Sequence, residues 1–173
     1  MENKLEEFKG AVIAVLTILG SFLGWKGIMA LVWAAAMLLD YISGSAAACK
    51  AGKWSSAVAR VGLWPKAGMI FAVVVAFFAD VALEIACANI PIGLVWPGVI
   101  MPLVLAWYIL TELGSILENA VRLGAKVPKW LTKFLAAFEH LVDDAADKVV
   151  DVGDTFAADG LESYADIAEQ VLE

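Results

Sequence analysis

Four acidic residues lie within otherwise apolar stretches of this 173-residue chain: Asp40, Asp80, Glu84 and Glu112. A carboxylate in hydrocarbon is costly, so each of these groups is expected to be protonated, hydrogen-bonded or in contact with water. Asp80 and Glu84 are four residues apart and therefore share one face of a helix. We interpret the four acids as pore-lining or otherwise polar intramembrane groups. Apart from Lys9 at the edge of the first expected span, no lysine or arginine lies inside the spans to neutralise them.

No residue pattern in the chain predicts covalent chemistry. The sequence contains no His/Cys/Asp ligand cluster, no phosphate-binding glycine loop and no nucleophile–base pair. Cys49 and Cys87 lack a metal-ligand spacing, and we interpret both as buried thiols. His140 has no partner cluster and is interpreted as an ordinary helix-face residue rather than a proton switch. We therefore expect no enzyme activity, no cofactor and no metal.

The elements that hold these acids are predicted to cross a membrane. The chain is 62% hydrophobic and 18% charged, with a mean hydropathy of +0.81, whereas soluble domains are about half apolar and a quarter charged. A buried soluble core is the alternative, but a chain of this size has too little interior for so many apolar residues. A signal peptide is a second alternative for residues 1–25. The mixed charges of the N-terminus and the lack of a cleavage site favour a retained helix.

The apolar runs predict an all-α membrane protein with four transmembrane helices and an acidic, amphipathic helical tail. About 20 apolar residues span the hydrocarbon core. The expected helices cover about 8–25, 28–49, 67–89 and 93–117. The segment Asn89–Gly93 supplies the turn between the last two. Pro97 and Pro102 should kink the fourth helix or move its first regular turn, with a start near Pro97 as the alternative.

The basic residues predict the orientation of the spans. They are plentiful before the first helix, between helices two and three, and after helix four, and scarce in the other connections. This alternation favours four crossings with both termini in the cytoplasm, whereas three crossings would put a basic cluster outside. The predicted membrane-surface residues are Lys50, Lys53, Arg60, Lys66, Lys126, Lys129 and Lys133. The last three flank Trp130, a pattern suited to anionic lipid headgroups.

The C-terminal segment 138–173 is strongly acidic, with Lys148 as its only basic residue apart from His140. Apolar residues nevertheless recur there at helical spacing. This periodicity favours two short amphipathic helices, interrupted or ended by Gly153 and Gly160, over a disordered tail. Self-association is one way for such helices to bury their apolar stripes.

Small residues continue the helix face of Asp40 at four-residue steps. They are Ala36, Gly44, Ala48 and Gly52. Small residues at this spacing let membrane helices approach closely. The contact they predict lies either between copies of the chain or within one four-helix unit, and the pattern alone does not choose between these.

Two stretches of the chain resemble the holin family of phage lysis and toxin secretion. The first holds Leu39-Asp40-Tyr41-Ile42-Ser43-Gly44, then Ala46-Ala47-Ala48-Cys49-Lys50-Ala51-Gly52-Lys53-Trp54-Ser55-Ser56, and continues as Gly62-Leu63-Trp64-Pro65-Lys66-Ala67-Gly68-Met69-Ile70. The second holds Glu112-Leu113-Gly114-Ser115-Ile116-Leu117-Glu118-Asn119-Ala120, followed by Leu123-Gly124 and Val127-Pro128. The resemblance covers about residues 28–135. Pro65 and the long tail 138–173 depart from the family pattern.

The resemblance implies a small protein that accumulates in the bacterial cytoplasmic membrane, forms homo-oligomers and opens lesions. An endolysin or a secreted toxin would then leave the cell without needing direct contact with it. Residues 1–125 would form the transmembrane holin-like domain, and 126–173 a cytoplasmic tail with a basic start and acidic helices. The expected partners are the lipid bilayer and other copies of the chain, with no nucleic acid.

Two other function classes are compatible with the same residues. In a small ion channel or transporter subunit, the intramembrane acids would bind cations. In a membrane scaffold, the acidic tail would recruit a partner protein and the spans would tolerate loss of the acids. The holin interpretation is favoured because it alone accounts for the order and placement of both motif stretches.

Overall fold

The computed structural model describes the backbone of residues 2–90 and 95–172, and side chains within 24–57, 60–90 and 95–155. Its elements are α1 (Glu2–Lys50), α2 (Ser56–Val61), α3 (Leu63–Asn89), α4 (Ile100–Arg122) and α5 (Lys129–Leu172). The described residues form helices and no strands, which confirms the predicted all-helical class.

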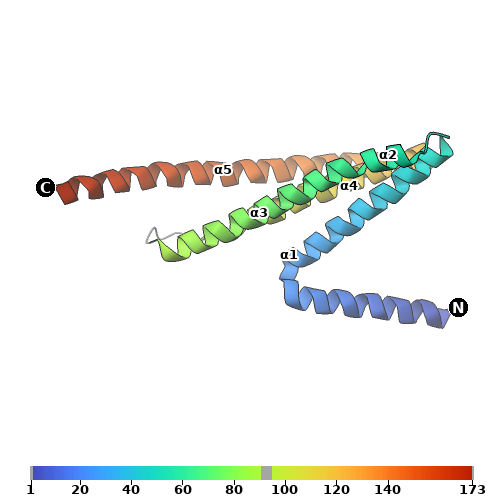
Figure 1. Ribbon diagram of the computed structural model, residues 1–173, viewed down its shortest axis with the longest axis horizontal. Coiled ribbons are helices and arrows are strands. Elements are labelled where there is room, and N and C mark those ends of the chain that lie inside the picture. Colours follow the sequence, from blue (N-terminus) through green and yellow to red (C-terminus); the bar gives the residue numbers. More distant parts are fainter. Residues whose placement is uncertain (1, 91–94, 173) are drawn as a thin grey trace.

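Helix α1 joins the two helices predicted at 8–25 and 28–49 into one element broken at Gly24 (Figure 1). Gly24 has φ 63° and ψ −169°, a conformation that glycine adopts readily because it has no Cβ. The segment before Gly24 turns away from the other helices (Figure 1). Its side chains lie outside the described residues, so a membrane crossing at 8–25 stays a prediction.

Three helical segments of the described part of the chain are long and apolar enough to cross a membrane. They are Gly24–Lys50 in α1, Leu63–Asn89 (α3) and Ile100–Arg122 (α4). Their lengths of 27, 27 and 23 residues exceed the roughly 20 residues that span the hydrocarbon core.

Two predicted boundaries were wrong. Helix α3 starts at Leu63 rather than 67, with Pro65 in its first turn, where a missing backbone donor removes no helical hydrogen bond. Helix α4 covers Ile100–Arg122 rather than 93–117, and its start is closer to the predicted alternative near Pro97. Pro97 and Gly98 precede it, and Gly98 has φ 66°, which is incompatible with a regular helix. The proposed turn Asn89–Gly93 includes residues 91–94, which lie outside the described residues.

Helix α4 is the central helix of the chain, since it packs against α1, α3 and α5. A small core forms where Trp33 of α1, Val73 of α3 and Leu105 of α4 meet. Trp33 also stacks on Tyr108, with ring centroids 6.0 Å apart. Outward-facing positions remain apolar, including Phe71, Val75 and Phe78 on α3, as expected of helices whose solvent is lipid.

The tail is one helix, and the prediction of two short helices was wrong. Helix α5 passes through both Gly153 and Gly160 without interruption. A glycine inside a helix costs only about 1 kcal/mol, which neighbouring helix formers can offset. The connection 124–128 reverses the chain, with Gly124 at φ 95°, so that α5 returns alongside α4 (Figure 1).

Candidate functional site

A buried ionic cluster joins the three candidate spans. The ammonium nitrogen of Lys66 on α3 lies 2.6 Å from both Glu112 carboxylate oxygens on α4. The same nitrogen lies 3.0 Å from Oδ2 of Asp40 on α1. The Glu112 side chain is 2% exposed and that of Lys66 is 14% exposed. A lysine ammonium has three N–H donors, which suits one cation held between two carboxylates.

The three charged residues meet because each lies at a similar depth along its helix. Asp40 precedes Lys50, the last residue of α1, by ten residues, and Glu112 precedes Arg122, the last residue of α4, by ten. At about 1.5 Å per residue, both carboxylates lie roughly 15 Å inside those helix ends. Lys66 is ten residues beyond Ser56, where α2 begins, and α2 leads into α3 along the same direction (Figure 1).

Asn119 extends the polar cluster on α4. Its amide nitrogen donates to Oδ1 of Asp40 at 3.0 Å and to the Ser43 hydroxyl at 3.1 Å. Its carbonyl oxygen accepts from Arg122 at 3.3 Å. Leu105, Glu112 and Asn119 are each seven residues apart and are all buried, so they form one seam of α4. These hydrogen bonds satisfy an amide that would be costly to bury alone.

The expectation that no cation neutralises the intramembrane acids was wrong for Asp40 and Glu112, which pair with Lys66, and for Glu84, which pairs with Lys26. Lys66 was assigned to the membrane surface because helix three was expected to begin at 67, after it. The earlier start of α3 places this residue in the first turn, with its side chain directed at α1 and α4. Two carboxylates and one ammonium leave a formal charge of −1, and pairing lowers the cost of holding these charges away from water.

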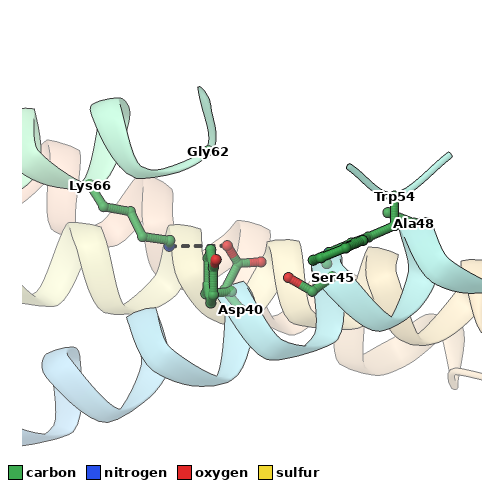
Figure 2. Close-up of a pocket in the computed structure, with 8 residues that line it drawn as sticks. Asp40, Ser45, Ala48, Trp54, Gly62 and Lys66 are labelled. Atoms are coloured by element: carbon green, nitrogen blue, oxygen red, sulfur yellow. Dashed lines mark ion pairs between the residues drawn. The ribbon is translucent and has the colours of Figure 1, made fainter. Parts of the chain in front are cut away.

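A cavity of about 170 Å³ adjoins the cluster. Asp40 and Lys66 lie on its wall, together with Gly44, Ala48 and Trp54. Figure 2 shows Lys66 reaching from α3 towards Asp40, while the Trp54 indole lies near Ser45 and Ala48. One water occupies about 30 Å³, so the cavity can hold water beside the ion pair. The Asp40 side chain, 19% exposed, has access to this space.

Asp80 has a structural role at the start of α4. One carboxylate oxygen accepts from the Trp96 indole at 2.9 Å and from the Ile100 backbone N–H at 3.0 Å. The other accepts from the Met101 N–H at 2.9 Å. The residue is 3% exposed. A carboxylate at this position satisfies backbone donors that lack helical partners and interacts favourably with the helix dipole.

Glu84 lies one turn beyond Asp80 and is more exposed. Its side chain is 49% exposed, and its Oε1 lies 3.9 Å from the ammonium nitrogen of Lys26. The loop before α4 passes over this pair: a Cβ at Gly98 would collide with both Lys26 Nζ and Glu84 Oε1. The absence of a side chain at Gly98 therefore permits the close approach of the loop.

The predicted small-residue face makes contacts within one chain. A Cβ at Gly44 would lie 3.4 Å from the Asn119 amide nitrogen, so α4 approaches α1 closely there. Ala36 is buried, and Ala48 lines the cavity. Gly52 lies beyond the end of α1, in a turn with φ 66°. These contacts support the intramolecular alternative for Gly44, and a contact between copies remains a prediction.

The remaining predicted surface cations lie at helix ends and connections. Lys50 donates to the Leu123 carbonyl at 2.6 Å, which ties the end of α1 to the end of α4. The others are exposed: Lys53, Arg60, Lys126, Lys129 and Lys133. Trp130 among them is 66% exposed, which leaves its indole free to meet an interface.

Sequence reasoning missed Asn119, Ser43 and the pairing role of Lys66. One signal was available for Asn119: it follows Glu112 by seven residues, which places both on one helix face. The partners of Asp80 gave no comparable signal, because Trp96 and the backbone donors of Ile100 and Met101 reach it through loop geometry. No group of three or more His, Cys, Asp or Glu side chains that could hold a metal occurs among the described residues.

Comparison with known proteins gives one family and several relatives. Residues 17–140 match the model of the bacteriophage holin family. An uncharacterized protein of Halalkalibacterium halodurans is 32% identical over 71% of this chain and 87% of its own. Uncharacterized proteins of Listeria innocua and Listeria monocytogenes are 27% and 28% identical, over 81% and 76% of this chain and 92% and 86% of theirs. No solved structure matches the chain.

The family match includes all three candidate spans, the ionic cluster and the first part of α5. It also confirms the resemblance predicted from the two motif stretches. The chain is a holin-like, multi-pass membrane protein, and it belongs to the bacteriophage holin family.

Proposed function

We propose that this protein is a holin that assembles in the bacterial cytoplasmic membrane and opens lesions large enough for folded proteins. The lesions release an endolysin during host lysis, or a toxin during secretion, without requiring contact between holin and cargo. The observation that carries the proposal is the family match over residues 17–140, which extends through every candidate span of the described chain.

The ionic cluster fits this proposal as the device that holds the three spans in one unit. Apolar helices have little hydrophobic drive to associate in lipid, so hydrogen bonds and close packing must hold them together. Lys66, Asp40, Glu112 and Asn119 supply such bonds between α1, α3 and α4. We propose that copies associate as preformed three-helix units, with both the 51–62 and 123–128 connections on the cytoplasmic side.

The cation channel remains the alternative function, and the side-chain contacts favour it less. Asp40, Asp80 and Glu112 each bond to partners within the chain. A cation path would need several of these carboxylates to face water together. Only Glu84 has a side chain that is about half exposed. We therefore propose that the first three acids organise the unit, rather than line the lesion as the sequence suggested.

Controlled expression in a bacterium tests the proposed function. The gene is induced together with a cytoplasmic muramidase that has no secretion signal, and culture turbidity and muramidase release are followed. A holin gives a delay, then abrupt lysis with muramidase in the medium. Graded loss of ions with the muramidase retained in the cells would instead support a selective channel. Induction without the muramidase controls for lysis caused by membrane stress alone.

A further inference from the structure

Helix α5 runs antiparallel to α4 at the depth of the candidate span (Figure 1). Near the end of α4, Gly114 and Ser115 share a cavity with Thr132 and Ala136 of α5. Near its start, α4 shares another cavity with the later part of α5, lined by Val104, Trp107, Val142, Asp143 and Ala146. Residues 132–146 of α5 therefore traverse the same thickness as most of α4.

The surface of α5 has three sectors. One faces α4 and is half-buried, with the residues Leu131, Leu135, Glu139, Val142, Ala146 and Val149. Asp143, at the edge of this sector, lines the cavity shared with the start of α4. Beside it lies an exposed apolar flank formed by Phe134, Phe138, Leu141 and Val152, which are 50%, 43%, 58% and 48% exposed. The third sector is polar and exposed, with Lys133, His140, Asp144, Asp147, Lys148 and Asp151. Successive residues of a helix are about 100° apart, so each set occupies its own side.

The polar sector cannot face lipid at this depth. A single aspartate or lysine at the centre of a membrane helix costs about 2.5–3.5 kcal/mol on insertion scales. Asp144 and Asp147 would both meet hydrocarbon if α5 lay beside α4 on the outside of an isolated unit. One helix cannot enclose water by itself, so the arrangement requires further copies whose polar sectors face the same water.

We propose that α5 lines the aqueous lumen of the lesion. Copies of the chain are arranged around the lumen with the polar sector of α5 towards water and the α4-facing sector against their own spans. The apolar flank, with Phe134, Phe138 and Leu141, packs against the neighbouring copy. The outer face of α3, with Phe71 and Phe78, meets lipid. This inference rests on the proposed function, because the lumen is that of the proposed lesion.

The geometry has a consequence for the C-terminus. Helix α5 starts next to the end of α4 and is directed away from it, so residues beyond Asp151 emerge on the membrane side opposite to Gly124. The basic-residue pattern instead predicted a wholly cytoplasmic tail. In the assembled lesion, α5 therefore adds one membrane crossing to those of the apolar helices. This helix is too polar to cross a membrane outside the assembly.

Site-specific labelling of the full-length protein in vesicles tests this placement. Cys49 and Cys87 are replaced by alanine, and an environment-sensitive fluorophore is attached to a single cysteine. The positions are Asp144→Cys on the polar sector, Phe134→Cys on the flank and Asp154→Cys beyond the span as a control. Quenching by aqueous iodide and by nitroxides attached to lipid chains is measured. The same vesicles are loaded with a folded fluorescent protein, and its release reports lesion formation.

A lumen lining predicts strong iodide quenching at 144 and 154 and at least several-fold weaker iodide quenching at 134. Equal iodide quenching at 134 and 144 would overturn the proposal, because it would place α5 free in water. Equal quenching of both positions by lipid nitroxides would place α5 in lipid and overturn it as well. If either pattern occurs in vesicles that release their cargo, lesion formation stands and only the lining fails. Absence of cargo release would count against the proposed function itself.

Cross-linking provides a second measurement that does not depend on fluorophore behaviour. Ser115→Cys is paired with Ala136→Cys, which lines the same cavity, and, as a matched control, with Ala137→Cys on the far side of α5. A short bis-maleimide should join 115 to 136 within one chain at several times the yield for 115 and 137. Equal yields for the two pairs in membranes would contradict the packing of α5 on α4.

Discussion

The ammonium nitrogen of Lys66 lies 2.6 Å from both carboxylate oxygens of Glu112, which joins α3 to α4 through two largely buried side chains. The third charged partner, Asp40, brings in α1. Three helices that have little hydrophobic reason to associate in lipid are thus held by one cation. Several testable consequences depend on this arrangement.

Replacing Lys66 with methionine should destabilise the helical unit strongly. The change keeps an unbranched side chain only one atom shorter but leaves Asp40 and Glu112 without a cation. Breaking a buried ion pair on one side costs about 3–5 kcal/mol. Unfolding of the detergent-solubilised protein, followed by circular dichroism, measures the loss. The triple variant K66M/D40N/E112Q removes all three charges and should recover much of the stability. A triple variant no more stable than K66M would show that the charges are not the cause.

Replacing Asp80 with alanine should loosen the start of α4. The carboxylate accepts two backbone N–H groups and the Trp96 indole, and unsatisfied buried donors cost roughly 1–3 kcal/mol. Amide hydrogen exchange at residues 100 and 101 should become faster. Glu84→Ala, one turn away on the same helix, is the matched control and should change exchange there far less. Equal effects of the two substitutions would contradict the capping role of Asp80.

Replacing Asn119 with leucine should weaken the contact between α1 and α4. The amide donates to Asp40 and Ser43, and loss of these bonds is expected to cost roughly 1–3 kcal/mol. Asn89→Leu is the comparison, because the Asn89 amide bonds only to the Ile85 carbonyl of its own helix. A smaller loss of thermal stability for N119L than for N89L would be incompatible with the interhelical role assigned to Asn119.

Glycines 44 and 68 should respond differently to a larger side chain. A Cβ at Gly44 already meets the Asn119 amide at 3.4 Å, whereas a Cβ at Gly68 meets nothing within 4 Å. Gly44→Leu is therefore expected to cost about 1–3 kcal/mol through overpacking. Gly68→Leu should be close to neutral in the same unfolding measurement. If G44L had the same free energy of unfolding as the unchanged protein, α1 and α4 would not approach each other closely in the membrane.

The amino-acid sequence predicts the helical class well because a long apolar run in a membrane must satisfy its backbone hydrogen bonds internally, which a helix does. It also indicates the acids that matter, since charges stand out in such runs. The helix boundaries were predicted less accurately because single residues set them. Helix α3 begins before Pro65, which the first turn of a helix tolerates, and α4 begins only after Gly98, whose φ is positive. Lys66 lies at the start of α3, so the error in that boundary made it a predicted membrane-surface cation instead of the ion-pair partner of Asp40 and Glu112. Its contacts with Asp40 and Glu112 join residues distant in the chain, so spacing alone could not reveal them.

The tail shows a different limit. Its helical periodicity was evident, but the packing of α5 against α4 depends on the reversal at Gly124 and on shapes that no sequence period encodes. Glycines 153 and 160 were interpreted as breaks because glycine is a weak helix former. The structure continues through both, since about 1 kcal/mol at each position does not by itself end a helix.

Release of cargo from vesicles tests the central proposal most directly. The purified protein is reconstituted in vesicles that contain both a small fluorescent dye and a folded fluorescent protein of endolysin size, and escape of the two is followed simultaneously. A holin predicts that, after assembly, the dye and the folded protein leave the same vesicles together. Escape of the dye with complete retention of the folded protein, at protein densities that permeabilise most vesicles, would contradict lesion formation and support a small channel.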